Sequence, residues 1–197
     1  MRRDDLHADP IRQFDAWHEE ARQAGIPLAE ACAVATVSTD GQPSARMVLL
    51  KGTDDRGFVF ATSYASRKAR ELDATPRAAL LFYWQALGRQ VRVEGAVERV
   101  SPQESDAIFM ARPRASRISA LASHQSEPLL DRRALEARVD ELERELEGRE
   151  VERPDFWGGY RVVPDEVEVW QHDDNRLHHR FLYRRAGAGW EIEGLQP

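Results

Sequence analysis

The sequence is poor in cysteine and has no long apolar stretch. Its single cysteine, Cys32, excludes an intrachain disulfide framework and a thiolate metal cluster, and it fits a reducing, cytoplasmic setting. No apolar run approaches the ~18 residues of a membrane-spanning helix. The charged start, residues 1–5, has no apolar stretch behind it, so we expect no secretory signal. The formal net charge of −6 argues against general nucleic-acid binding, although it leaves room for local basic pockets.

Several common catalytic motifs are also missing. The chain has neither a glycine-rich phosphate loop nor a dinucleotide-binding glycine pattern, and it lacks the G-x-S-x-G serine elbow. The histidines that lie closest together along the chain are His172, His178 and His179. Two of these are adjacent and would point to opposite faces of a strand, so we expect no metal site.

The hydrophobic pattern predicts one domain over residues 1–197 in which strands outnumber helices. A helical segment at about residues 1–27 contains an amphipathic helix at 10–24, and further helices are expected at 66–74, 101–111 and 131–148. Strands are expected at 31–38, 45–51, 58–62, 78–84, 90–98, 160–163, 167–171, 180–184 and 190–192. Strands at such short intervals favour an antiparallel β-barrel or sandwich with peripheral helices, a mainly β fold of the α+β class.

The helix at 131–148 carries the clearest apolar stripe. Leu135, Val139, Leu142 and Leu146 follow one another at helical spacing. Such a stripe is typical of a core face or of a subunit contact.

A first group of basic residues lies at the predicted strand 45–51 and at the start of the predicted helix 66–74. Lys51 and Lys68 are the only lysines among 28 basic residues. Arg46 and Lys51 are five residues apart, so they face opposite sides of their strand unless a bulge intervenes. Arg67 and Lys68 follow Ser66, where backbone N–H groups, the helix dipole and two cations can converge on a phosphate. An ordinary solvated basic helix start explains the pattern equally well.

Two further clusters carry cations at regular spacing. Arg112, Arg114, Ser116 and Arg117 form the second, and Arg112 and Ser116 lie one turn apart if their segment is helical. They suit a second phosphate or an exposed basic helix. In the third cluster Arg176, His178 and Arg180 have period two and would share one face of a strand. They suit an anionic or aromatic ligand or an outward-facing polar strand face.

In their order along the chain, these clusters resemble the pyridoxamine/pyridoxine 5'-phosphate oxidase family of FMN enzymes. The resemblance covers residues 9–197, and seven short segments in register carry it. They are Arg46–Lys51 (RMVLLK), Ser66–Lys68 (SRK), Gly88–Val91 (GRQV), Arg112–Arg114 (RPR), Gln125–Ser126 (QS), Phe156–Arg161 (FWGGYR) and Arg176–His178 (RLH).

The resemblance implies an FMN-binding split β-barrel and a homodimer with FMN at the subunit interface. It implies that Arg46, Arg67 and Lys68 bind the FMN phosphate with help from Ser126. The further flavin contacts that it implies are Met47, Val48, Leu49, Lys51, Ala61, Thr62, Gln90, Gln125, Trp170 and Arg180.

The implied reaction is oxidation of pyridoxamine 5'-phosphate or pyridoxine 5'-phosphate by O2 to pyridoxal 5'-phosphate and hydrogen peroxide. A hydride would pass from the substrate 4' carbon to flavin N5. Arg176 and His178 would be the catalytic residues that hold the pyridine ring. The other substrate-binding residues implied are Lys51, Ile108, Arg112, Ser116 and Leu177.

The chain departs from the family pattern mainly on the substrate side. Ile108 stands where the family often has tyrosine, His179 where it usually has aspartate, and Gly194 where it has arginine. Two alternatives therefore stay open. One is a sister FMN oxidase acting on another reduced aromatic compound of the phenazine type. The other is a non-catalytic protein that binds flavin or pyridoxal phosphate.

Overall fold

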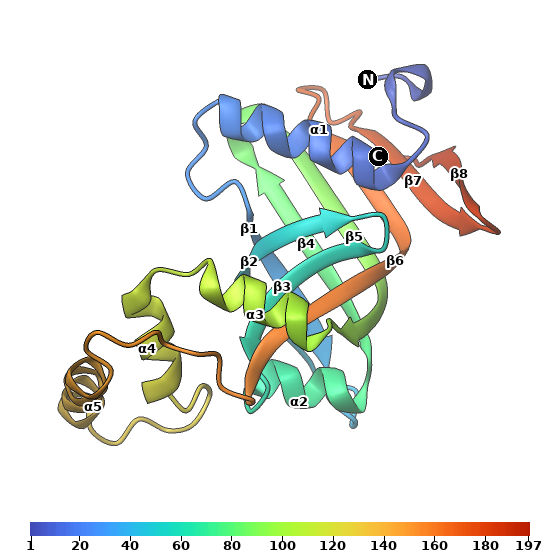
Figure 1. Ribbon diagram of the computed structural model, residues 1–197. Coiled ribbons are helices and arrows are strands. Elements are labelled where there is room, and N and C mark those ends of the chain that lie inside the picture. Colours follow the sequence, from blue (N-terminus) through green and yellow to red (C-terminus); the bar gives the residue numbers. More distant parts are fainter.

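The computed structural model describes residues 1–197 and is built around a strongly bent antiparallel sheet (Figure 1). The strand order is β3-β2-β1-β4-β5-β6-β7-β8, and an additional pairing of β3 with β6 closes six of the strands into a barrel. The strands are β1 (Ala31–Val37), β2 (Pro43–Asp54), β3 (Gly57–Ser63), β4 (Arg77–Trp84), β5 (Arg89–Arg99), β6 (Trp157–Gln171), β7 (His179–Ala186) and β8 (Gly189–Gly194). The predicted antiparallel barrel is confirmed.

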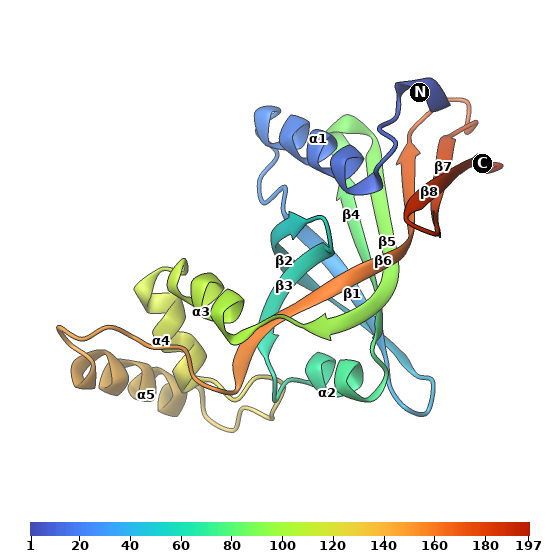
Figure 2. The ribbon, with the colours of Figure 1, turned by 45° about the vertical axis from the view of Figure 1, so that its right-hand side comes forward.

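Alternation along the strands directs apolar side chains into the barrel. In β4, Leu80, Phe82 and Trp84 are buried, as every second residue of a half-covered strand should be. Helix α1 (Pro10–Gln23) begins at the N-cap Asp9 and inserts Phe14 among these rings, with its centroid 4.6 Å from that of Phe82. This helix therefore closes one end of the barrel (Figure 2).

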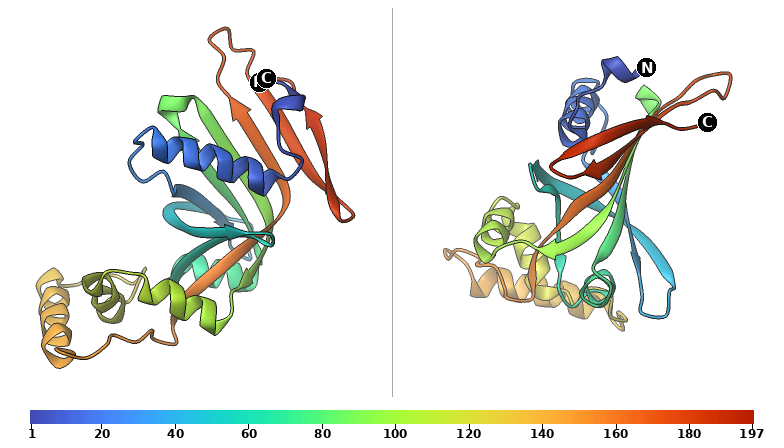
Figure 3. Two further views of the ribbon diagram at one scale, coloured as in Figure 1. Left: turned by 45° about the horizontal axis from the view of Figure 1, so that its top comes forward. Right: turned by 90° about the vertical axis from the view of Figure 1, so that its right-hand side faces the viewer.

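The remaining helices lie at the other end and along one flank. They are α2 (Arg67–Ala74), α3 (Pro102–Met110), α4 (Arg114–Ala122) and α5 (Arg132–Glu145), with short 3-10 turns at Arg3–Asp5 and Gln85–Leu87. Helices α3, α4 and α5 enclose a second, smaller core that includes Phe109, Ile118 and Trp157. The β7–β8 hairpin projects from the end of the sheet that is remote from these helices (Figure 3). None of the helices has both the length and the apolarity needed to cross a bilayer.

One predicted break in a strand is wrong. The segments 160–163 and 167–171 belong to the single strand β6, although the sequence between them reads as a turn. The β5–β6 register shifts between Glu94 and Gly95, so the irregularity is absorbed as a bulge. A Cβ at Gly95 would lie 1.9 Å from the Val163 carbonyl oxygen, and glycine at this position is what allows the close approach.

One other prediction is wrong, and two are refined. The conditional helix around Arg112 and Ser116 is present as α4, but it begins at Arg114, so Arg112 lies in the turn before it. The strand face proposed for Arg176, His178 and Arg180 is wrong because β7 begins at His179. Arg176 lies in the preceding loop with a φ of +66°, in the left-handed region. Of the predicted stripe at α5, Leu142 is buried, and the other three residues pack partly buried against the smaller core.

Candidate active site

A cavity of about 480 Å³ opens between β2, β3, the α3–α4 turn and the start of α2. Eleven of its fourteen lining residues are among the predicted site residues: Met47, Val48, Leu49, Lys51, Ala61, Thr62, Lys68, Ile108, Arg112, Ser116 and Gln125. Sequence reasoning missed Ala111, Pro113 and Trp157. The segment FWGGYR included Trp157 without assigning it a role, and the two others adjoin the predicted Arg112.

The ammonium of Lys68 lies buried at the start of α2, where Ser66 caps the helix. Its Nζ donates to Thr62 Oγ1 and to Gln125 Oε1, both at 3.0 Å, and the residue is 7% exposed. Burial, together with the like charge of Arg46, lowers the pKa of Lys68 to about 8. A buried cation whose hydrogen-bond partners are neutral is well suited to an anion.

Arg46 and Arg67 meet beside the same helix start. Arg46 lies on the inner face of β2 and donates to Thr36, Ser44 and the carboxylate of Glu71. The backbone N–H of Arg67 donates to Ser126 Oγ at 3.1 Å. The structure therefore brings the four predicted phosphate-binding residues to one helix end, although only Lys68 of the four lines the cavity.

Lys51 reaches the cavity from an irregular point of β2. The β2–β3 register shifts between Leu50 and Gly52, which leaves Lys51 as the extra residue of a bulge. Its side chain lines the cavity together with Met47 and Leu49.

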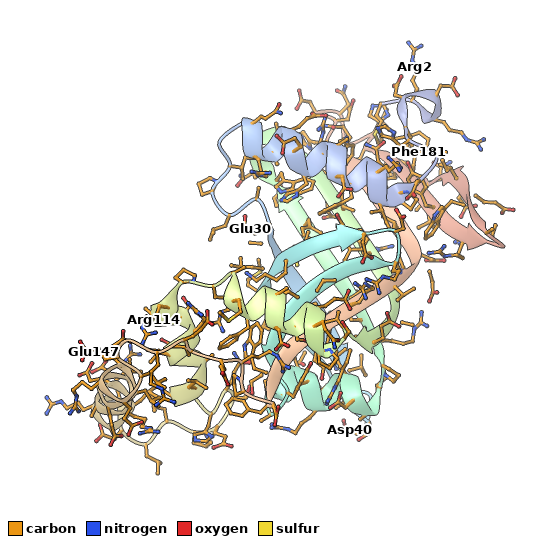
Figure 4. The ribbon with its side chains drawn as sticks, in the orientation of Figure 1. Arg2, Glu30, Asp40, Arg114, Glu147 and Phe181 are labelled. Carbon is orange, nitrogen blue, oxygen red and sulfur yellow. The ribbon has the colours of Figure 1, made fainter.

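Arg112 is the cation of the second cluster that lies in the cavity without a partner. Its Nη1 is buried and has no hydrogen bond, and its guanidinium carbon lies 4.9 Å from the centroid of the Trp157 ring. Burial lowers the pKa of Arg112. Arg114, labelled in Figure 4, instead donates to the Leu146 carbonyl of the segment after α5, and Arg117 donates to the Val151 carbonyl. The α3–α4 turn thus places Arg112 at the cavity, together with Ser116 from the first turn of α4.

The other predicted site residues lie at a different end of the sheet. Gln90, Trp170 and Arg180 are paired in one row across β5, β6 and β7. The β6–β7 loop next to this row holds Arg176, Leu177 and His178. The His178 ring centroid is 4.6 Å from that of Trp170, and Arg180 donates to the buried Glu168 at 2.7 Å. One chain does not bring this group to the cavity beside α3 and α4 (Figure 3).

An apolar surface connects the two groups across the outer face of the sheet. Met47 pairs with Ala33 in β1, which pairs with Leu81 in β4, and the adjacent Tyr83 pairs with Gln90. Met47, Leu81 and Tyr83 are 65%, 38% and 56% exposed. Large apolar side chains exposed together in this way are typical of an interaction surface.

Comparison with known families matches most of the chain. Residues 18–144 match the family described as "Pyridoxamine 5'-phosphate oxidase". Residues 157–197 match the "Pyridoxine 5'-phosphate oxidase C-terminal dimerisation region". The second match contains Trp170, Arg180 and the β6–β7 loop, which a single chain holds away from the cavity, whereas Gln90 lies in the first match.

Curated relatives and solved structures are similar over almost the full length. A pyridoxine/pyridoxamine 5'-phosphate oxidase of Rubrobacter xylanophilus is 58% identical, covering 98% of this chain and 89% of its own. One of Cupriavidus taiwanensis is 53% identical, with 98% and 91% covered. The structure of PhzG from Burkholderia lata 383 with tetrahydrophenazine-1-carboxylic acid has a TM-score of 0.94 at 37% identity, with 98% and 95% covered. An FMN-binding protein from Nostoc punctiforme, with a TM-score of 0.78 at 19% identity over 98% of this chain and 100% of its own, shares the fold.

Proposed function

This chain belongs to the pyridoxamine 5'-phosphate oxidase family of FMN-dependent oxidoreductases, and on that premise we propose its substrate and mechanism. It oxidises pyridoxamine 5'-phosphate or pyridoxine 5'-phosphate with O2 to pyridoxal 5'-phosphate and hydrogen peroxide, in one split-barrel domain over residues 1–197. The observation that carries the proposal is a cavity with two cationic sites on different elements. Lys68 lies at the start of α2, and Arg112 lies with Ser116 at the α3–α4 turn. Cofactor and substrate each bring one phosphate.

The residues at the start of α2 fit the phosphate of a flavin. Lys68 is buried with neutral hydrogen-bond partners, and the capped helix start adds a favourable dipole for an anion. Arg46, Arg67, Lys68 and Ser126 would hold the FMN phosphate. The apolar side chains of Val48, Leu49 and Ala61 would line the flavin. When bound, FMN supplies the hydride acceptor and the route for electrons to O2.

Arg112, Ser116 and Lys51 would hold the substrate phosphate. The buried, unpaired Nη1 of Arg112 can form a charge-assisted hydrogen bond with a phosphate oxygen, and such bonds are stronger than neutral ones. Because this contact is remote from the 4' carbon, its role is to fix the orientation of the substrate before reaction.

A second copy of the chain would complete the site. The match of residues 157–197 to a region described as a dimerisation region supports a homodimer. A two-fold interface places the same surface of each copy against the other. The exposed apolar face of β1, β2 and β4 supports this arrangement, since it extends from the cavity to the strand row of Gln90 and Trp170. FMN would then lie at the interface, with Gln90, Gln125, Trp170 and Arg180 around it. Arg176, Leu177 and His178 of the partner subunit would contact the pyridine ring.

A sister activity on a reduced aromatic compound is the second candidate. Ile108 lines the cavity one helical turn before Arg112, and its side chain has no donor for a phosphate. The similarity to PhzG from Burkholderia lata, solved with tetrahydrophenazine-1-carboxylic acid, favours the same alternative. A non-catalytic binding protein would keep the flavin without turning over either substrate.

An anaerobic flavin spectrum separates these functions. The FMN-loaded protein should lose its oxidised flavin absorbance after addition of pyridoxine 5'-phosphate or pyridoxamine 5'-phosphate, and air should restore it with release of peroxide. A flavin that stays oxidised with both substrates and bleaches with a reduced phenazine would establish the sister oxidase. If none of these compounds reduces the flavin, the non-catalytic binding protein is the function that remains.

Replacing Ile108 with tyrosine should lower the KM for both phosphorylated substrates. A phenolic O–H at this position can donate to the substrate phosphate, and a hydrogen bond to a charged group is worth about 1.5–3 kcal/mol. We therefore expect a decrease in KM of about tenfold or more, with little change in kcat. Ile108→Phe is the matched control because it adds the ring without the hydroxyl. Equal effects of the two substitutions would contradict a missing phosphate donor.

The affinity for FMN should decrease above about pH 8. The phosphate binds the protonated Lys68, and the pKa of Lys68 in the free protein is lowered to about 8. The bound anion raises that pKa again, so FMN affinity is highest below the free-protein value and falls as the pH rises through it. Fluorescence titrations between about pH 6.5 and about pH 9.5 would measure this, with riboflavin as the phosphate-free control. Parallel pH profiles for the two flavins would contradict the role of Lys68.

A further inference from the structure

The carboxylate of Glu71 is buried beneath the cations at the start of α2. Its side chain is 6% exposed, and its Oε2 accepts hydrogen bonds from Thr36 Oγ1 at 2.5 Å and Ser44 Oγ at 2.6 Å. The same oxygen accepts from Arg46 Nη2 at 3.2 Å, and Oε1 accepts from Arg67 Nε at 2.8 Å. Burial by itself raises the pKa of Glu71, but these donors outweigh it and lower the pKa to about 2. Glu71 is therefore ionised throughout the neutral range.

This one carboxylate connects two of the three cations assigned to the FMN phosphate. Arg67 is on the same helix, one turn before Glu71, whereas Arg46 comes from β2. The contact with Glu71 uses only the Nε of Arg67, so both Nη groups keep their donors for another anion. Two long side chains that would otherwise sample many rotamers are thus held at the helix start. Their conformational entropy is therefore lost during folding and not when the ligand binds.

Glu71 also adjusts the charge of the cluster. Arg46, Arg67 and Lys68 supply three positive charges, and Glu71 supplies the one carboxylate that contacts two of them. The cluster keeps two positive charges, which complements the charge of about −1.5 to −2 that a phosphate monoester carries at neutral pH. Without Glu71, three neighbouring cations would repel one another in the free protein.

We propose that Glu71 is a positioning residue that sets the geometry and the net charge of the FMN phosphate site. The inference rests on the proposed function, because it takes Arg46, Arg67 and Lys68 as phosphate ligands. Glu71 does not touch the phosphate itself. It acts through the two arginines, and its effect is specific to the phosphorylated form of the flavin.

The test compares FMN with riboflavin, which has the same ring system and no phosphate. Apoprotein carrying Glu71→Ala should bind FMN about tenfold or more weakly, while its affinity for riboflavin changes less than about twofold. Glu71→Gln keeps one acceptor oxygen for an arginine and should recover part of the FMN affinity. Asp73→Asn is the matched control on α2, since that carboxylate contacts Arg99 and Tyr160 and none of the three cations.

Three outcomes would overturn the proposal. Equal loss of FMN and riboflavin affinity would show a purely structural role, and unchanged or tighter FMN binding would show that the arginines need no anchor. If Glu71→Ala does not fold, as judged by circular dichroism, the comparison is made with Glu71→Gln, where full FMN affinity would overturn it. The parent protein separates this result from the function itself: equal affinity of the parent for both flavins would contradict the phosphate site, whatever the variants do.

Discussion

Arg176→Ala is expected to leave FMN bound and to remove most of the turnover. Arg176 lies in the β6–β7 loop, at the end of the sheet remote from α2 of its own chain (Figure 3). Its guanidinium beside the pyridine ring would stabilise charge that develops during oxidation. Removing one such preorganised group costs about 100-fold or more in kcat. Steady-state peroxide release and the visible flavin spectrum would measure the two effects. Arg184→Ala on β7 is the control, because Arg184 is paired with Glu166 and Glu193. Turnover at the parental rate would contradict the role of Arg176.

The same variant also tests whether two chains build one site. If Arg112 of one chain works with Arg176 of the other, Arg176→Ala and Arg112→Ala should complement each other when co-expressed. Random pairing makes half of the dimers mixed, and each mixed dimer has one intact site and one doubly altered site. About a quarter of the parental activity should return. No recovery at all would show that both arginines act within one chain.

The second large effect is expected from Lys68→Ala, which should weaken FMN binding about 100-fold. The ammonium is buried, and removing one partner from a buried ionic contact costs about 3–5 kcal/mol. An affinity change of this size corresponds to at least two decades in Kd. Titration of the apoprotein with FMN and with riboflavin would measure it, and riboflavin affinity should change little.

Two further variants make the Lys68 result specific. Arg70→Ala removes an exposed cation from the same helix, where Arg70 contacts only the Ala65 carbonyl oxygen, and FMN affinity should be retained. Lys68→Arg keeps the charge but replaces the compact ammonium that contacts Thr62 and Gln125 with a larger planar group, so we expect it to recover FMN affinity only in part. Unchanged FMN affinity in Lys68→Ala would refute its assignment to the phosphate.

Much of the local structure was predictable from short patterns. Ser66 before Arg67 and Lys68 indicated a helix start with converging donors, and the structure has α2 with Ser66 as its N-cap. Ser101 and Glu104 form the capping box that begins α3. These signals are local, since each depends on backbone groups within one turn.

Other features could not be read from spacing. The stretch between 163 and 167 looked like a turn, yet Gly95 on the neighbouring strand lets β6 continue through a bulge. Likewise, spacing alone does not show which of Arg112 and Arg114 forms hydrogen bonds within the chain. Arg114 donates hydrogen bonds to backbone carbonyl oxygens of the segment after α5, whereas Arg112 keeps a donor without a hydrogen bond in the cavity.

The sequence by itself determined the antiparallel strand pattern, the family resemblance and the set of cationic side chains that we propose as phosphate ligands, because alternation, capping and short motifs are local properties. The tertiary structure alone decided which cations are neutralised and which stay free. Arg46 meets Glu71 from 25 positions away, and the Arg176 loop lies far from the cavity of its own chain (Figure 3). Such pairings depend on how the bent sheet brings distant segments together, and no spacing along the chain encodes that geometry.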